Sequence, residues 1–204
     1  MNTDRTDSSA QSWFRSANCD ARYGAALLGV VMLVLALSAL GDWGRETLEY
    51  ERAALARYQW WRLISAHLVH LGWRHALLNC AGLALLWMLF AREFPPRRWL
   101  WIALLAAASI DAGLWFLRPA VDWYLGASGV LHGAWAAGAL TLYRRGDGIG
   151  AALLLLLIVK LVYEQQSGAS LLYGAVPLVG AAHLYGTLGG ALGAVLPRAP
   201  GKSL

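Results

Sequence analysis

Residues 24–41 read GAALLGVVMLVLALSALG, an uncharged apolar run that decides the class of this fold. An α-helix rises about 1.5 Å per residue, so about 20 apolar residues cross the roughly 30 Å hydrocarbon core of a bilayer. The run is about long enough for one crossing. No clean small-x-small cleavage site follows it, and more apolar runs come after it, so we interpret it as a retained span rather than a signal peptide.

The composition of the whole chain supports this interpretation. Hydrophobic residues make up 58% of the 204 residues and charged residues only 14%. Soluble globular domains carry about 25% charged residues. A chain of this size has too little interior to bury so many apolar side chains in water, whereas a lipid bilayer can cover them. The formal charge of +5 comes with basic residues that gather in short connectors, which points to membrane topology and lipid headgroups rather than to nucleic acid.

Five further apolar runs follow the first, separated by connectors rich in Arg, Pro and Gly. They predict helices over about residues 63–90, 99–117, 127–143, 149–163 and 180–196. We therefore expect an all-α integral membrane protein, a bundle of six transmembrane helices. Its predicted divisions are a disordered cytoplasmic tail (1–22), a six-helix membrane domain (23–197) and a short cytoplasmic tail (198–204).

Basic residues in the connectors predict the orientation. With six spans both termini lie on one side of the membrane. That side holds ten Lys and Arg residues and the other side six. Because cytoplasmic connectors carry the excess of basic residues, both termini are expected in the cytoplasm. The ten are Arg5, Arg15, Arg22, Arg92, Arg97, Arg98, Arg144, Arg145, Arg198 and Lys202, and the six are Arg45, Arg52, Arg57, Arg62, Arg74 and Arg118.

A possible nucleophile lies in GASGVLHG, residues 126–133. Ser128 stands between Gly126 and Gly129 near the start of a predicted helix, where free amides and the positive end of the helix dipole favour a developing oxyanion. A lone serine in a membrane helix more often packs or bonds to its own backbone. The motif alone is therefore a weak signal.

His183 raises the significance of Ser128. It lies near the start of the last predicted span, at a depth comparable with Ser128. Gly186 and Gly190 follow on roughly its own helix face, and Gly129 lies on the Ser128 helix. Small residues let two membrane helices approach closely. We expect this approach to bring the imidazole within hydrogen-bond reach of the hydroxyl, as nucleophilic catalysis requires.

A third group of polar residues lies in HLVHLGWRHALLN, residues 67–79. His75 and Asn79 are four residues apart, so both should project from one helix face and could stabilise an oxyanion. His67, His70 and His75 also have helical spacing, which leaves a metal site as an alternative. No HExxH motif and no nearby carboxylate support it, and we expect neither metal nor cofactor.

In combination these motifs resemble the rhomboid intramembrane serine proteases. The matching residues, in family order, are Trp61-Arg62, His70, His75 with Asn79, Gly126-x-Ser128-Gly129, and Ala182-His183-x2-Gly186-x3-Gly190. The resemblance covers about residues 24–196. It implies a six-helix bundle and a Ser128–His183 dyad without an acidic third member. It also implies an oxyanion site made by His75, Asn79 and the Ser128 amide beside Gly126.

One departure from the family pattern narrows the resemblance. Rhomboids usually carry Tyr four residues after the nucleophile, where it packs on the catalytic imidazole, but this chain has His132. The pattern GxSGxLHG in a compact chain resembles the rhombosortase subgroup of the bacterial inner membrane. That likeness implies substrates that are exported proteins with a C-terminal Gly-Gly sorting tail, an apolar helix and a basic end, cut near the start of the tail. A monomer whose site opens to the periplasm is expected.

Several alternatives stay open at this stage. His132 is four residues from Ser128 and could itself reach the hydroxyl, although His183 is favoured as the base. Lys160 and Glu164 are interpreted as an interfacial ion pair, with a role at the active site as the alternative. Asp111 has no obvious partner in the sequence, and Arg118 is one candidate. A general rhomboid protease, a non-catalytic rhomboid-like client-binding protein and a small transporter are the competing functions.

Overall fold

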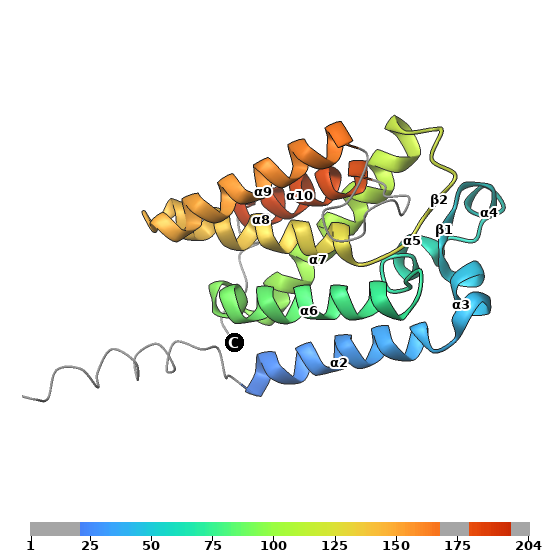
Figure 1. Ribbon diagram of the computed structural model, residues 1–204, viewed down its shortest axis with the longest axis horizontal. Helices are drawn as coiled ribbons and strands as arrows, with labels where there is room; N and C mark the ends of the chain where they lie inside the picture. The colour runs from blue at the N-terminus through green and yellow to red at the C-terminus, as the bar shows by residue number, and fades with distance from the viewer. Residues whose placement is uncertain (1–20, 168–179, 197–204) are drawn as a thin grey trace, which may run out of the picture.

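The computed structural model describes residues 21–167 and 180–196 of the chain and is mostly helical, as predicted. Figure 1 shows the long helices lying side by side, with the short elements gathered at one end of the bundle. In chain order the elements are α2 (Ala21–Ser38), α3 (Gly41–Leu48), β1 (Tyr50–Glu51), α4 (Arg52–Ala56), α5 (Arg62–Ser65), α6 (Trp73–Phe90), η1 (Ala91–Glu93), α7 (Pro96–Ala112), η2 (Gly113–Leu117), β2 (Trp123–Tyr124), α8 (Ser128–Arg144), α9 (Gly148–Ser167) and α10 (Gly180–Val195). The predicted tails lie outside the described residues, except for residues 21 and 22, which belong to α2.

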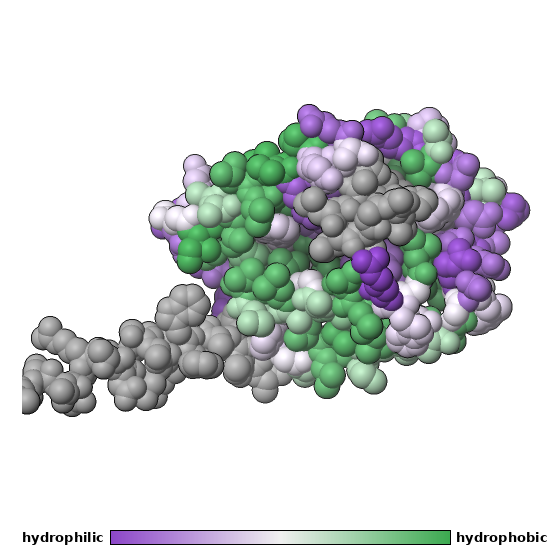
Figure 2. Space-filling view, viewed as in Figure 1, coloured by the Kyte–Doolittle hydropathy of each residue, from purple (hydrophilic) through white to green (hydrophobic). Residues whose placement is uncertain are grey.

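Among the described residues, three helical stretches are long and apolar enough to cross a membrane: Trp73–Glu93, Pro96–Leu117 and Gly148–Ser167. A fourth candidate is the pair Tyr23–Ser38 and Gly41–Leu48, which is bent by 107° between its two halves. Helices α8 and α10, with 17 and 16 residues, are shorter. In the space-filling view, apolar residues cover the sides of the bundle, and hydrophilic residues gather at the end that carries α3 and α4 (Figure 2). The described residues thus hold three to four candidate spans, which indicates a membrane protein.

The second predicted helix is wrong in its first third. The expected run over 63–90 is broken, because only the four-residue α5 forms before Trp73. The break lies at Gly72, whose φ of 138° is a left-handed conformation that other residues rarely adopt. His67 and His70 therefore lie in a connector and do not continue the helix of His75. Helical spacing among the three histidines, on which the metal alternative rested, is not present.

Helices α8 and α10 are in direct backbone contact. A Cβ added at Gly186 would lie 2.1 Å from the carbonyl oxygen of Gly129, and one added at Gly190 would lie 2.1 Å from that of Gly133. Such distances are far below van der Waals contact, so only glycine fits these positions. Helix α10 also packs along α7. The sequence predicted helix packing through Gly129, Gly186 and Gly190, and these three glycines lie at this contact.

The connector between the first two long helices folds back on the segment before α8. Strand β1 pairs antiparallel with β2, with Tyr50 opposite Tyr124. Beside this pair, Arg52 reaches the end of α7. Its guanidinium donates to four carbonyl oxygens and lies 4.8 Å from the Trp115 ring centroid. The four acceptors belong to Leu114, Trp115, Arg118 and Val121. These contacts hold the chain segment that precedes Ser128 in place.

Candidate active site

Ser128 is the first residue of α8, and the turn before it depends on glycine. Gly126 has a φ of 110°, in the left-handed region. Its amide donates to the carbonyl oxygen of Ala66 at 2.8 Å, and its own carbonyl oxygen accepts from the Tyr124 hydroxyl at 2.8 Å. The first amides of a helix have no acceptor inside the helix. The turn thus presents the Ser128 amide and hydroxyl at the positive end of α8.

His183 lies across the α8–α10 contact from this turn. Its Nε2 is 2.8 Å from Ser128 Oγ, which is hydrogen-bond distance, and its side chain is buried. A neutral imidazole in this position can take the hydroxyl proton as Ser128 attacks a carbonyl. The glycine contact beneath the two side chains brings their helices close enough for this hydrogen bond.

Glu164 is a third member of the cluster, although the sequence pattern favoured an interfacial ion pair and left a role at the active site only as the alternative. Its Oε2 lies 2.7 Å from His183 Nδ1, and its Oε1 bonds to Lys160 Nζ one turn earlier on α9. The expected arrangement without an acidic third member is therefore wrong. The interfacial interpretation of Lys160 and Glu164 is wrong as well, because the Glu164 side chain is fully buried. A carboxylate inside an apolar run was the available signal, since intramembrane charges mark functional sites.

His132 packs against the face of the His183 imidazole, whereas Glu164 lies at its edge. Its ring lies parallel to that of His183, with centroids 4.0 Å apart and 11° between the planes. Its Nδ1 is 2.7 Å from the carbonyl oxygen of Ser128, so its hydrogen bond to that residue goes to the backbone and not to the hydroxyl. The geometry thus favours His183 over His132 as the partner of Ser128 Oγ.

His75 and Asn79 share one face of α6, as their spacing predicts. A Cβ at Gly126 would lie 2.8 Å from Cε1 and 3.0 Å from Nε2 of His75, so the imidazole lies directly against the turn before Ser128. The Asn79 side-chain amide donates to the carbonyl oxygen of His75 at 2.9 Å. An amide group carries two N–H donors, so this bond leaves one available. His75 thus lies beside the turn that carries Ser128, and Asn79 lies one turn further along the same face of α6.

His70 supports the turn from the connector before α6. Its Nε2 accepts from the amide of Ala127 at 3.4 Å, and its ring stands edge to face with that of His75, with centroids 4.9 Å apart. Burial, with His75 nearby, lowers the pKa of His70 to about 4. The ring is therefore neutral near pH 7, as an acceptor nitrogen must be.

Asp111 has a different partner from the one proposed. Its Oδ1 lies 3.3 Å from Nε2 of His67 rather than beside Arg118, whose carbonyl oxygen accepts from Arg52. The His67 ring also stands edge to face with Tyr124, with centroids 5.5 Å apart. The pair thus lies beside Tyr124, whose hydroxyl holds the turn before Ser128.

In the part of the chain that the structure describes, one group of three side chains has ligand atoms close enough for a metal ion: His132, Glu164 and His183, within 4.8 Å of one another. The two imidazoles are stacked, however, and a metal needs the in-plane lone pairs of its histidines to converge. Both nitrogens of His183 are already engaged. The arrangement fits proton transfer better than metal binding.

Comparison with known proteins identifies the family. The family model of the Rhomboid domain matches residues 57–199, which is more than half of the chain and includes Ser128, Glu164 and His183. No curated protein is similar enough to the chain to count as a match. Members of the matched family are intramembrane serine proteases. With a mostly helical fold and helices long and apolar enough to span a bilayer, the chain belongs to the rhomboid family.

Proposed function

We propose that this chain is an intramembrane serine endopeptidase in which Ser128 is the nucleophile and His183 the general base. The observation that carries this is the 2.8 Å separation of Ser128 Oγ and His183 Nε2 across the α8–α10 contact. The Rhomboid domain match supports the reaction class.

Acylation moves one proton and exchanges one bond. His183 Nε2 takes the hydroxyl proton while Ser128 Oγ bonds to the carbonyl carbon of the substrate. The tetrahedral intermediate then breaks its C–N bond, and the protonated imidazole gives its proton to the leaving amine. The products of this half-reaction are an ester on Ser128 and a released C-terminal segment.

Deacylation repeats the proton transfers with a second nucleophile. His183 removes a proton from water or from an amine, which attacks the ester carbonyl and restores the Ser128 hydroxyl. Water gives hydrolysis, and an amine gives transfer of the substrate to an anchor. In both half-reactions the oxyanion would be held by the Ser128 amide at the start of α8, with His75 and Asn79 contributing from α6.

The proposed substrates are exported bacterial proteins with a C-terminal tail made of a Gly-Gly motif, an apolar helix and a basic end. His132 in the motif GASGVLHG supports this choice, because this pattern is what resembles the rhombosortase subgroup. Glycine also favours local unwinding of the substrate helix, which must expose a carbonyl to Ser128. The proposed setting is the bacterial inner membrane, with six spans, both termini in the cytoplasm and the site open to the periplasm.

The test is tail cleavage in cells. The chain is co-expressed in a bacterial host with a secreted reporter that ends in a Gly-Gly motif, an apolar helix and basic residues, and the reporter's intact mass is measured. We expect the wild type to release the tail, and Ser128→Ala and His183→Ala to leave it attached. An unchanged reporter mass in wild-type cells would contradict the proposal.

A matched reporter separates the competing functions. In this control two leucines replace the Gly-Gly pair and the rest of the tail is kept. Cleavage of both reporters at similar rates would favour a general rhomboid protease. A reporter that stays intact but co-purifies equally with wild type and Ser128→Ala would favour the non-catalytic client-binding alternative.

A further inference from the structure

Glu164 is the most deeply buried charged side chain of the described cluster, and each of its carboxylate oxygens has a polar partner. The residue is 2% exposed, and its side chain is fully buried. One carboxylate oxygen faces His183 Nδ1 at 2.7 Å, and the other bonds to Lys160, whose side chain is only 17% exposed. A charge held in a low-dielectric interior is costly unless it is paired and hydrogen-bonded. Glu164 is both paired and hydrogen-bonded, and one of its bonds is to the proposed base.

The two nitrogens of His183 have different partners. Nε2 faces a hydroxyl, which donates its proton during attack, so Nε2 must be bare in the resting state. Nδ1 must then carry the hydrogen, and it faces a carboxylate oxygen, which accepts it. The carboxylate thus selects the tautomer in which the nitrogen that faces Ser128 is free to act as a base.

We infer that Glu164 is a positioning residue for His183, which makes the proposed Ser128–His183 pair the front of a serine–histidine–glutamate array, and that Lys160 is the counter-ion that keeps Glu164 ionised. This inference rests on the proposed function. Glu164 does not touch the substrate. It holds the imidazole plane and tautomer and faces the positive charge that His183 gains during each attack.

The proton balance is simple. In the resting state Glu164 is −1, Lys160 is +1 and His183 is neutral. When Ser128 attacks, its proton moves to His183 Nε2, and the positive imidazolium stays hydrogen-bonded to Glu164 through Nδ1–H. The substrate oxygen becomes the negative oxyanion at the same moment. Glu164 takes up no proton, and the imidazole returns to neutral when it protonates the leaving amine.

The first experiment compares Glu164→Gln with the wild-type full-length chain in detergent or vesicles. Ser128 reactivity is measured with a fluorophosphonate probe, and kcat and KM with the Gly-Gly reporter tail. In serine–histidine–aspartate enzymes, changing the carboxylate to an amide costs about 10⁴-fold in kcat because the wrong tautomer is held. We expect kcat and the labelling rate to fall by at least about 10²-fold, with KM and the thermal unfolding midpoint little changed. A purely structural residue would change the midpoint and not kcat selectively.

Lys160 supplies a second, independent variant. If Lys160 acts only through Glu164, removing it matters only while Glu164 is charged. Lys160→Gln is expected to lower kcat by itself, and Glu164→Gln with Lys160→Gln should be no worse than Glu164→Gln alone, which is the non-additivity expected of coupled neighbours. The double variant is an uncharged pair of similar size. It therefore still decides the question if Glu164→Gln alone does not fold.

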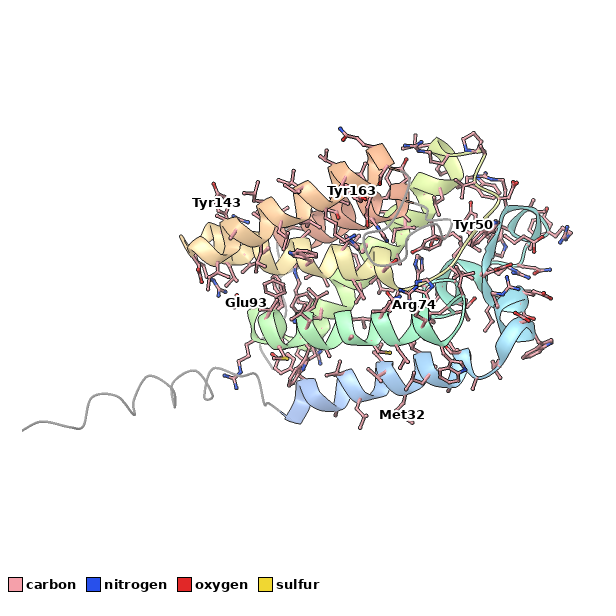
Figure 3. All side chains as sticks on the ribbon, in the orientation of Figure 1. Met32, Tyr50, Arg74, Glu93, Tyr143 and Tyr163 are labelled. Carbon is pink, nitrogen blue, oxygen red and sulfur yellow. The ribbon has the colours of Figure 1, made fainter. Side chains whose placement is uncertain are left out.

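Glu93→Gln is the matched control, because Glu93 also pairs with a basic side chain, Arg145, and is partly buried. Figure 3 labels Glu93 at the end of the bundle opposite Tyr50 and Arg74. This variant should keep wild-type kcat and labelling. If Glu164→Gln and the double variant both stay within about threefold of wild type, the inference is overturned. If the double variant is tenfold worse than Glu164→Gln, the counter-ion role of Lys160 is overturned.

Failure of the inference and failure of the proposed function give different results. If wild type is labelled at Ser128 and Ser128→Ala is not, the nucleophile stands, and the Glu164 variants then decide only the positioning role. If wild type is labelled but the reporter tail is not cut, the substrate class is wrong, and the labelling rates still test Glu164. If wild type is neither labelled nor active, both proposals are overturned together.

Discussion

The imidazole of His132 lies face to face with that of His183, with ring centroids 4.0 Å apart and an angle of 11° between the planes. His132 is fixed in this position because its Nδ1 bonds to the Ser128 carbonyl oxygen, one turn back on its own helix. The base is thus bounded by a flat ring on one face and by Glu164 at one edge. These two contacts limit how far the His183 ring can turn.

Replacing His132 separates stacking from proton transfer. His132→Tyr keeps an aromatic face beside His183 and should retain most activity, whereas His132→Ala should lose about 2- to 13-fold, the equivalent of the 0.5–1.5 kcal/mol of one aromatic contact. His183→Ala should lose 10²–10⁴-fold, as expected for removing a general base. The measurement is kcat on the reporter tail. Abolished cleavage in His132→Tyr with retained cleavage in His183→Ala would reverse the assignment of the base.

The glycine contact between α8 and α10 predicts a large effect of one methyl group. Gly190→Ala would place a Cβ 2.1 Å from the Gly133 carbonyl oxygen, so the helices must separate. Overpacking of this kind costs about 1–3 kcal/mol or more. We expect a lower thermal unfolding midpoint in detergent and a slower fluorophosphonate reaction. Gly29→Ala on α2 is the control, because nothing lies within 4 Å of a Cβ there, and it should match the wild type in both measurements.

A substitution in the turn before Ser128 should lower activity as well as stability, whereas a similar substitution far from the site should lower stability alone. Gly126→Ala combines the cost of a left-handed φ with a contact of 2.8 Å to His75. Gly146→Ala also has a positive φ, 81°, but nothing lies within 4 Å of its Cβ. The backbone conformation should cost both variants about 1–2 kcal/mol of stability, and the His75 contact should add to this cost in Gly126→Ala. Only Gly126→Ala should also lose about 10²-fold in labelling rate, because it displaces the nucleophile. Equal labelling rates in the two variants would contradict this account.

The lowered pKa of His70 predicts that the protein becomes less stable in acid. Its pKa is about 4 in the folded protein against an ordinary 6.5, so the unfolded chain binds the proton first as the pH falls. The stabilisation is therefore complete above about pH 6.5 and is lost as the pH falls to about 4, by up to about 3 kcal/mol. Thermal unfolding at pH 7 and pH 4.5 should show a smaller acid shift in His70→Gln than in wild type. Leu71→Ala, at an exposed neighbouring position, should keep the wild-type shift.

The sequence predicted the features that depend on local patterns. Apolar runs indicated where the long helices lie, because membrane burial leaves a continuous signal in hydropathy. The spacing of glycines around Ser128 and His183 indicated that two helices distant in sequence approach closely, and the structure brings their side chains to hydrogen-bond distance. Whether the bundle crosses the membrane six times stays a prediction.

The features that sequence analysis missed depend on long-range contacts. Glu164 and Lys160 have the spacing of an ordinary surface pair, and only the packing of α9 beside α8 and α10 shows that the carboxylate faces His183. The partner of Asp111 was missed for the same reason, since His67 lies on a connector more than forty positions earlier. The break at Gly72 was hidden because an apolar run has the same hydropathy in a helix and in a buried connector.

The backbone contact between α8 and α10 also restricts how a substrate can reach Ser128. Where the glycines of one helix touch the carbonyl oxygens of the other, no side-chain rotation could open a passage. Parting them would pull His183 away from Ser128 and dismantle the site. We therefore expect a substrate segment to approach from another side, such as the one where α6 lies against the turn before Ser128. The contact between α8 and α10 fixes the distance between Ser128 and His183. Any movement that admits a substrate must therefore come from other parts of the chain.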